Sequence, residues 1–229
     1  MEKTADISRS SALVTIFGLL RHGQTEWNII KRIQGSADSP LSEQGKQQTA
    51  AWAESLQTYG WDQIIASPLG RVRATVAILN EKLRLPVSFD SRLREQHWGE
   101  WEGLTLPHVR QHCHEDLARR VAMGWEFAAP GGETRRAVRD RVFTTLQENA
   151  LKWPGQKILV VCHQGVVKSV LYSFDGRDFL PGEDPLLEHN RLHLISCTGQ
   201  NFAPLQLNIL PTTSTLNTSV GAHTDAPLQ

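Results

Sequence analysis

The sequence has few cysteines, and this scarcity excludes one class of protein. Only three occur among 229 residues, far apart at Cys113, Cys162 and Cys197. An odd number of distant cysteines without a C-x-x-C pair argues against a disulfide framework, so we expect reduced thiols in a cytoplasmic protein. Cys162 lies within an apolar run, which predicts a small core residue rather than a nucleophile.

The chain also lacks an excess of charge and a long apolar run. Its 24 Lys and Arg balance 24 Asp and Glu, and no polybasic run occurs. Nucleic acid and anionic membrane surfaces are therefore not expected as main partners. No apolar stretch approaches the roughly 20 residues of a membrane span. The N-terminus lacks a basic, then apolar, then small-residue signal pattern, so we expect no export.

Two common functional motifs are missing. Without a G-x-x-x-x-G-K run, nucleotide binding of the P-loop type is not supported. His108, His112 and His114 stand close together, and the first two have the i, i+4 spacing that zinc ligands can use. No Glu follows His108 and no carboxylates cluster nearby, so a solvated helix face is favoured. We predict no metal site and no cofactor.

The alternation of strand-like and helix-like segments predicts one α/β domain over residues 13–210. Residues 1–12 are expected to be a flexible leader, and residues 211–229, rich in Ser, Thr, Pro and Asn, a disordered tail. The predicted fold is a three-layer α/β/α sandwich around a mostly parallel sheet with one antiparallel edge strand.

The expected elements follow from periodicity and from helix-capping or helix-breaking residues. Strands are predicted at Leu13–Leu20, Asp62–Ser67, Pro86–Phe89, Lys157–Cys162, Arg191–Ser196 (the edge strand) and Pro204–Leu210. Helices are predicted from Ser42 to Tyr59, Leu69 to Leu83, Thr105 to Met123, after Gly132 to Trp153, and from Val166 to Leu171; residues 21–40 are predicted to be a loop.

Polar clusters follow three of these strands at once. They are Arg21-His22-Gly23, Ser67-Pro68-Leu69-Gly70-Arg71 and His163-Gln164-Gly165. Because loops at the carboxyl edge of an open α/β sheet converge, we expect one cleft there. Gly23 would let a ligand approach the backbone closely.

The chemistry of that cleft points to phosphate. Arg21 and Arg71 would repel each other unless an anion lies between them, and guanidinium groups match phosphate oxygens. A neutral imidazole, His22 or His163, can act as a nucleophile. Glu95 is the nearest acid that could protonate a leaving oxygen. Each of these residues alone would be better explained by a structural role, but together, at three strand ends, they favour a catalytic site.

The first cluster also carries a resemblance. Leu20-Arg21-His22-Gly23-Gln24-Thr25-Glu26-Trp27-Asn28 resembles the signature of the histidine phosphatase superfamily, also called phosphoglycerate mutase-like. The resemblance extends over residues 14 to 197. Further matching blocks are Gln34-Gly35, Asp38-Ser39-Pro40-Leu41-Ser42-Glu43-Gln44-Gly45, Ser67-Pro68-Leu69-Gly70-Arg71, Leu93-Arg94-Glu95, Trp98-Gly99-Glu100-Trp101-Glu102-Gly103, Pro130-Gly131-Gly132-Glu133 and Val160-Val161-Cys162-His163.

The resemblance implies roles for the clustered residues. His22 would be the nucleophile that carries the phosphoryl group, Glu95 the proton donor, and Arg21, Arg71 and His163 the groups that hold the phosphoryl oxygens. The family mechanism needs no metal.

The resemblance also implies a substrate pocket lined by Asn28, Gln34 and Gly35. Gln164 departs from the family, since many relatives have glycine directly after the second histidine. Its amide could reach the phosphate or the leaving group, or could narrow the site.

Within the family, the run from Glu95 to Gly103 resembles phosphatases rather than mutases. The segment from Gly103 to Pro130 is short for a mutase and lacks basic, proline-rich elements that grip a second phosphate. We therefore predict a phosphomonoesterase acting on a small phosphate ester through a phosphohistidine on His22, with residues 97–130 as a specificity lid. That branch includes α-ribazole, sugar and phosphoserine phosphatases.

Three alternatives remain open. They are a cofactor-dependent phosphoglycerate mutase, a non-catalytic phospho-ligand binding module, and a metallohydrolase using His108, His112 and His114.

Overall fold

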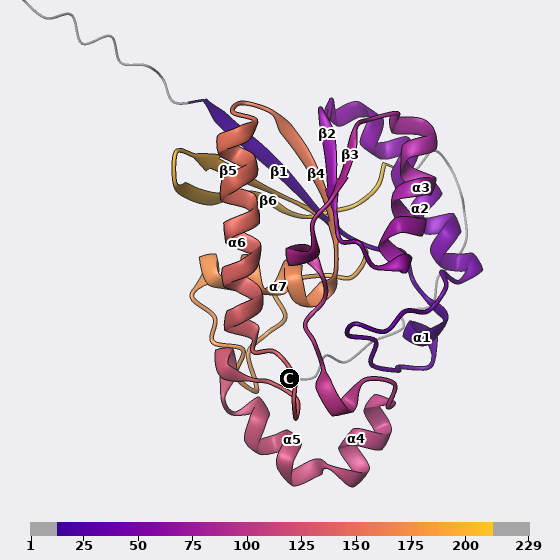
Figure 1. Ribbon diagram of the computed structural model, residues 1–229, viewed down its shortest axis with the longest axis vertical. Helices are drawn as coiled ribbons and strands as arrows, with labels where there is room; N and C mark the ends of the chain where they lie inside the picture. Colours follow the sequence, from indigo (N-terminus) through magenta and orange to yellow (C-terminus); the bar gives the residue numbers. More distant parts are fainter. Residues whose placement is uncertain (1–12, 213–229) are drawn as a thin grey trace, which may run out of the picture.

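A six-stranded sheet lies between two layers of helices in the computed structural model, which describes residues 13–212 (Figure 1). Helices α2 (Glu43–Leu56) and α3 (Gly70–Leu83) cover one face, and α6 (Arg135–Lys152) and α7 (Gln164–Asp175) cover the other. The predicted three-layer sandwich is thereby confirmed. The expected leader, residues 1–12, and the part of the expected 211–229 tail that follows Thr212 lie outside the described residues. The backbone N–H of Thr212 donates to Ser55 Oγ.

The order of strands in the sheet is β3-β2-β4-β1-β5-β6. The strands are β1 (Val14–Arg21), β2 (Gln63–Ala66), β3 (Val87–Phe89), β4 (Lys157–Cys162), β5 (Leu192–Thr198) and β6 (Asn201–Ile209). The first four run parallel, and β5 pairs antiparallel with both β1 and β6.

The single predicted antiparallel strand, β5, is therefore present, but its predicted place at the edge is wrong. A tight turn after Thr198 folds the chain back so that β6 pairs with β5, with Thr198 opposite Asn201. The edge strand is β6. Proline has no backbone N–H to donate, and an edge strand such as β6 tolerates this at Pro204.

Strands β1 and β4 are buried on both faces of the sheet. Along β1, Phe17 and Leu19 pack toward α6 and α7, whereas Leu20 packs toward α2 and α3. In β4, Ile158 packs toward α6 and α7, and Leu159 packs toward α2 and α3. This double burial explains why both strands read as continuous apolar runs.

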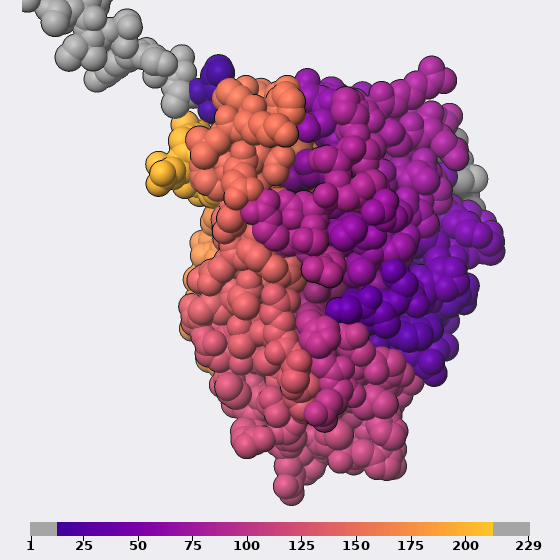
Figure 2. Space-filling view, in the orientation of Figure 1, coloured from indigo at the N-terminus to yellow at the C-terminus, as the bar shows by residue number. Residues whose placement is uncertain are grey.

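The segment between β3 and α6 differs from its prediction. One helix was predicted from Thr105 to Met123, but two are present, α4 (Leu106–His112) and α5 (His114–Val121). The break falls at Cys113, whose φ of −125° lies outside the helical range. Figure 2 shows this segment as the rose-coloured lower end of the molecule, beside the indigo residues of the loop after β1.

The predicted apolar stripe of that segment is nevertheless present. Val109, Leu117 and Val121 are buried together in a small core that is separate from those on the two sheet faces. Residues from outside the two helices complete it: Ile33, Trp101, Phe127 and Ala129.

Helix ends follow local chemistry. Ser42 caps α2 as predicted, because its Oγ accepts the Gly45 N–H at 3.0 Å. Helix α7 begins earlier and ends later than the predicted Val166–Leu171, with His163 as its N-cap and Gly176, at a φ of +67°, as its C-cap. A short helix, α1 (Glu26–Ile29), lies in the predicted loop, and single 3₁₀ turns occur at Gln57–Tyr59, Ser91–Leu93, Gly99–Trp101 and Gly124–Glu126.

The thiols match their prediction. All three cysteines are free, and Cys162 is completely buried, which raises the pKa of its thiol. Across residues 13–212, no helix combines the length and apolar character needed to cross a membrane.

Candidate active site

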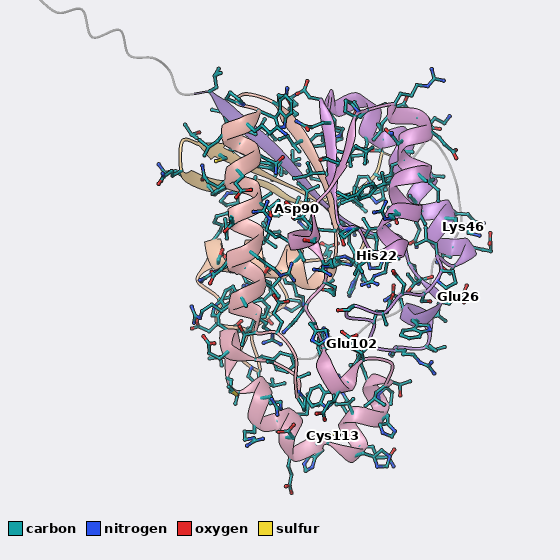
Figure 3. All side chains as sticks on the ribbon, in the orientation of Figure 1. His22, Glu26, Lys46, Asp90, Glu102 and Cys113 are labelled. Carbon is teal, nitrogen blue, oxygen red and sulfur yellow. The ribbon has the colours of Figure 1, made fainter. Side chains whose placement is uncertain are left out.

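The three polar clusters meet at one edge of the sheet, as predicted. Strand β4 lies between β2 and β1, so the residues that follow them are neighbours. The His22 N–H donates to Cys162 O at 3.0 Å, and the Ser67 N–H donates to Val161 O at 3.1 Å. In Figure 3, His22 lies between the sheet and the α4–α5 segment.

A cavity of about 260 Å³ opens at this edge. Eight of the nine predicted site residues line it: Arg21, His22, Asn28, Gln34, Gly35, Arg71, Glu95 and Gln164. The ninth, His163, is fully buried behind the wall, with its ring centroid 5.3 Å from that of His22. Such a volume lies near the lower end of the range for ligand pockets and suits a small metabolite.

His22 is held as a neutral base. Its Nδ1 lies 2.7 Å from Gly23 O, and a carbonyl only accepts hydrogen bonds, so Nδ1 carries the proton. The lone pair of the neutral ring is then on Nε2. Burial, followed by the charges of Arg21 and Arg71, holds the pKa of His22 well below its usual value, against the opposing effect of the Gly23 bond.

His163 is tied to the neighbouring strand end. Its Nε2 lies 2.8 Å from Ser67 Oγ, while its buried Nδ1 has no hydrogen-bond partner within the described chain. Burial first, and then His22 and Arg71, lowers the pKa of His163 well below its usual value. The Nδ1 of His163 is thus a buried polar atom without a partner in the described chain, beside the His22 ring.

Arg71 is only 2% exposed and is held rigidly by the loop before Pro40. Its Nη1 donates to Ala37 O at 2.7 Å and to Asp38 Oδ1 at 2.9 Å, and its Nη2 donates to Gly35 O at 2.8 Å. Nε is buried without a partner in the described residues. Nε and the second Nη2 hydrogen are thus free to bind an anion.

Asp38 is a functional residue that the sequence reasoning missed. Besides pairing with the Arg71 guanidinium, its carboxylate accepts the Gly70 N–H at 2.6 Å and the Arg71 N–H at 3.1 Å. It therefore anchors the first turn of α3 and aims Arg71. The only signal in the sequence was its position within one of the matching family blocks.

Glu95 faces the cavity with its carboxylate fixed by backbone donors. Gln96 N–H donates to Oε1 at 2.9 Å, and Gly165 N–H, at the start of α7, donates to Oε2 at 3.2 Å. This places the predicted acid beside the loops that carry both histidines.

Asn28 and Gln34 line the cavity and also stabilise its loop. Asn28 Oδ1 accepts from the Thr25 N–H at 3.0 Å and from Thr25 Oγ1 at 3.1 Å, which completes a capping box at α1. Gln34 Nε2 donates to Thr25 Oγ1 at 2.8 Å, and Gln34 Oε1 is buried without a partner in the described chain. Their loop-holding role was not predicted.

Gly23 has a packing role that was not predicted. A Cβ at this position would lie 2.5 Å from Thr49 Oγ1 and 2.9 Å from Gly45 O, both in α2. Packing against that helix is by itself enough to require glycine here.

The cavity is strongly basic, which the sequence reasoning did not anticipate. Its lining includes Lys31, Arg32, Arg135 and Lys168 besides Arg21 and Arg71, and Glu95 is the only carboxylate among the lining residues. Lys168 follows Gln164 by four residues on α7, so helical spacing could have placed it on the same face.

The histidines considered as zinc ligands are exposed on α4 and α5, as predicted. The rings of His108 and His112 lie 4.4 Å apart. Within residues 13–212, no three His, Cys, Asp or Glu side chains gather in a way that could hold a metal ion.

Comparison with known proteins places this arrangement in a family. Residues 17–210 match the model of the histidine phosphatase superfamily, branch 1. The chain is 31% identical over 179 residues to the uncharacterized phosphatase PhoE of Bacillus subtilis, covering 78% of this chain and 84% of that protein. It is 36% identical over 157 residues to the probable phosphoglycerate mutase GpmB of Salmonella paratyphi B, covering 68% and 72%.

A solved structure agrees with the sequence matches. A mycobacterial glucosyl-3-phosphoglycerate phosphatase, in complex with VO3, superposes with a TM-score of 0.74 at 29% identity, covering 85% of this chain and 99% of that one. The fold, the matched residues and the relatives agree. The chain belongs to the histidine phosphatase superfamily.

Proposed function

We propose that this protein is a metal-independent phosphomonoesterase that hydrolyses a small phosphorylated metabolite in the cytoplasm through a phosphohistidine on His22. The observation that carries the proposal is the neutral His22, with its Nε2 lone pair free, in a cavity that also holds Arg21, Arg71 and Glu95. The free cysteines support a reducing compartment.

In the first step, Nε2 of His22 attacks the phosphorus of the bound ester. The N–P bond forms as the bond from phosphorus to the leaving oxygen breaks, and Glu95 gives its proton to that oxygen. Arg21, the free donors of Arg71 and Nδ1 of His163 stabilise the charge on the phosphoryl oxygens.

In the second step, Glu95 acts as a base. Its carboxylate takes a proton from water while the water oxygen attacks the phosphorus, and the N–P bond breaks. Inorganic phosphate leaves, His22 returns to its neutral form and Glu95 is protonated again. Gln164 lines the cavity wall, and its amide would contact the phosphate or the leaving group.

A phosphoglycerate mutase is the second candidate, because a relative with 36% identity carries that name. The short α4–α5 segment favours the phosphatase. A mutase would interconvert the two monophosphoglycerates far faster than it releases phosphate, and only with added bisphosphoglycerate.

The test is phosphate release from 4-nitrophenyl phosphate near pH 6, with a chelator present, for wild type and His22→Ala. His108→Ala, which removes an exposed histidine outside the cavity, is the matched control. We expect wild type and the control to turn over and His22→Ala to fall to background. Equal rates for all three proteins would exclude His22 as the nucleophile. Loss of activity in chelator and its return with zinc would favour the metallohydrolase.

A further inference from the structure

Two cations in the cavity wall have no role in the proposed chemistry. Arg135 begins α6 and Lys168 lies on α7, and these two helices pack side by side (Figure 1). Both side chains line the same cavity as His22. They are therefore positioned to contact whatever is attached to the phosphate.

Arg135 is a buried charge without a carboxylate partner. It is 8% exposed, and its guanidinium lies between the rings of Phe127 and Phe179, at 4.3 and 4.6 Å from their centroids. Nη1 donates to Gly124 O at 3.1 Å and to Phe179 O at 3.3 Å. Carbonyl groups and ring faces hold the guanidinium in place. Burial lowers the pKa of Arg135 to about 10, and the charges of Tyr172 and Glu183, neither of which forms an ion pair with it, oppose that shift only in part.

The other arginines of α6 provide an internal comparison. Arg136 pairs with Glu126, Arg139 with Asp140 and Arg141 with Glu133. For Arg135, no carboxylate oxygen in the described chain lies within 4.0 Å. Arg135 is thus the most buried of the four arginines and the one without an ion pair. A buried charge without a counter-charge is unfavourable, and a ligand could supply that counter-charge.

Lys168 has the same deficit. Its Nζ lies 5.9 Å from the Tyr172 ring centroid, and no carboxylate oxygen of the described residues lies within 4.0 Å of it. Burial, then Arg135 and Arg21, lowers the pKa of Lys168 to about 8, with Glu95 opposing. Lys168 therefore shares the cavity wall with Arg135 and Arg21, and both of these charges act on its ammonium group.

We propose that Arg135 and Lys168 form a second anion subsite, which binds an acidic group of the substrate other than the phosphate that is transferred. The substrate would then be a small phosphate ester that also carries a carboxylate or a second phosphate. A guanidinium group matches either acid, and an acid placed there would relieve the repulsion between the two cations. The inference rests on the proposed function only for the position of the transferred phosphate.

Phosphonates test this subsite without turnover, since their P–C bond cannot be transferred. Titration calorimetry would compare 4-phosphonobutyrate, butane-1,4-diphosphonate and the neutral 4-hydroxybutylphosphonate on wild type, Lys168→Met and Lys168→Arg. Lys46→Met is the control, because Lys46 pairs with Glu43 on the outer side of α2, away from the cavity (Figure 3).

We expect wild type and Lys46→Met to bind at least one acidic phosphonate about tenfold more tightly than the neutral one. Lys168→Met should lose most of that preference, and Lys168→Arg should restore it. The stronger of the two acidic ligands identifies the acid. Failure of all three phosphonates to bind, equal binding of acidic and neutral ligands, or a preference that survives in Lys168→Met would overturn the subsite. Failure of phosphate release in the separate enzyme assay would refute only the proposed function.

Discussion

Ser67 Oγ and His163 Nε2 lie 2.8 Å apart across 96 positions of sequence. The Ser67 oxygen also accepts the Leu69 N–H, at 3.4 Å, so its own hydrogen is free to be donated to Nε2. A neutral His163 would then carry its proton on Nδ1, the ring nitrogen without a partner in the described chain. Ser67 thereby fixes Nδ1 of His163 as a donor, the role that the proposed mechanism gives it toward the phosphoryl oxygens.

Without the Ser67 hydroxyl, the proton of neutral His163 would no longer be held on Nδ1. Ser67→Ala should therefore lower kcat about tenfold, with a smaller change in KM. Steady-state kinetics on an aryl phosphate would measure this, and Ser67→Thr, which keeps the hydroxyl, should recover part of the rate. If Ser67→Ala has wild-type kcat, Ser67 does not position His163.

Glu95→Gln should reduce kcat by about 10²- to 10⁴-fold, because an amide cannot give a proton to the leaving oxygen. Binding of inorganic phosphate should stay close to the wild-type value, since the side-chain shape is kept. The deficit should shrink for esters whose leaving group is a good one, such as 4-nitrophenol, because these need less protonation. Full activity toward an alkyl phosphate in this variant would exclude Glu95 as the acid.

Gly165→Ala should impair catalysis although it changes none of the reacting groups. A Cβ at Gly165 would overlap Glu95 Oε1, so the carboxylate must move and its bond from the Gly165 N–H must lengthen. A displacement of about 1 Å at a reacting group can cost about a hundredfold in rate. Thermal unfolding of the variant would show that a loss of rate is not a loss of the folded state. Equal kcat for wild type and Gly165→Ala would show that Glu95 tolerates the shift.

His193 should make the protein less stable in mild acid. The residue is 2% exposed, its Nδ1 accepts the Asn208 N–H at 3.1 Å, and burial lowers its pKa to about 4. In the unfolded chain the pKa is about 6.5, so between these values the unfolded state binds the extra proton. The free energy of unfolding should therefore fall as pH drops from about 6.5 to 4, by up to about 3 kcal/mol from this group.

Urea unfolding at several pH values would test this. The pKa values of His22 and His163 are lowered in the same direction, so His193→Gln should flatten the slope of stability against pH without removing it. An unchanged slope in the variant would mean that His193 titrates normally in the folded protein.

Local patterns in the sequence predicted much of the fold. Strand β4 was predicted to the residue, because a continuous apolar run between a Pro-Gly break and a polar cluster has few other interpretations. The meeting of Arg21, Ser67 and His163 followed from the rule that parallel strands end at one edge.

Long-range contacts decided what the sequence reasoning missed. The pairing of Asp38 with Arg71 joins a loop to a distant helix, and no local pattern encodes it. Arg135 could not be told from the other arginines of α6 by spacing, since its burial depends on Phe179 and Gly124.

The separate core of the α4–α5 segment has a consequence for how such enzymes diverge. Val109, Leu117 and Val121 pack with one another rather than against the sheet. The effects of changes in this segment and of changes at the sheet edge should therefore be nearly additive, with little coupling between them. A descendant could rebuild the segment, and with it the wall of the cavity contributed by Leu106, while inheriting the phosphate chemistry intact. If the proposed function holds, selection can thus act on this wall of the cavity and on the catalytic groups as two largely independent traits.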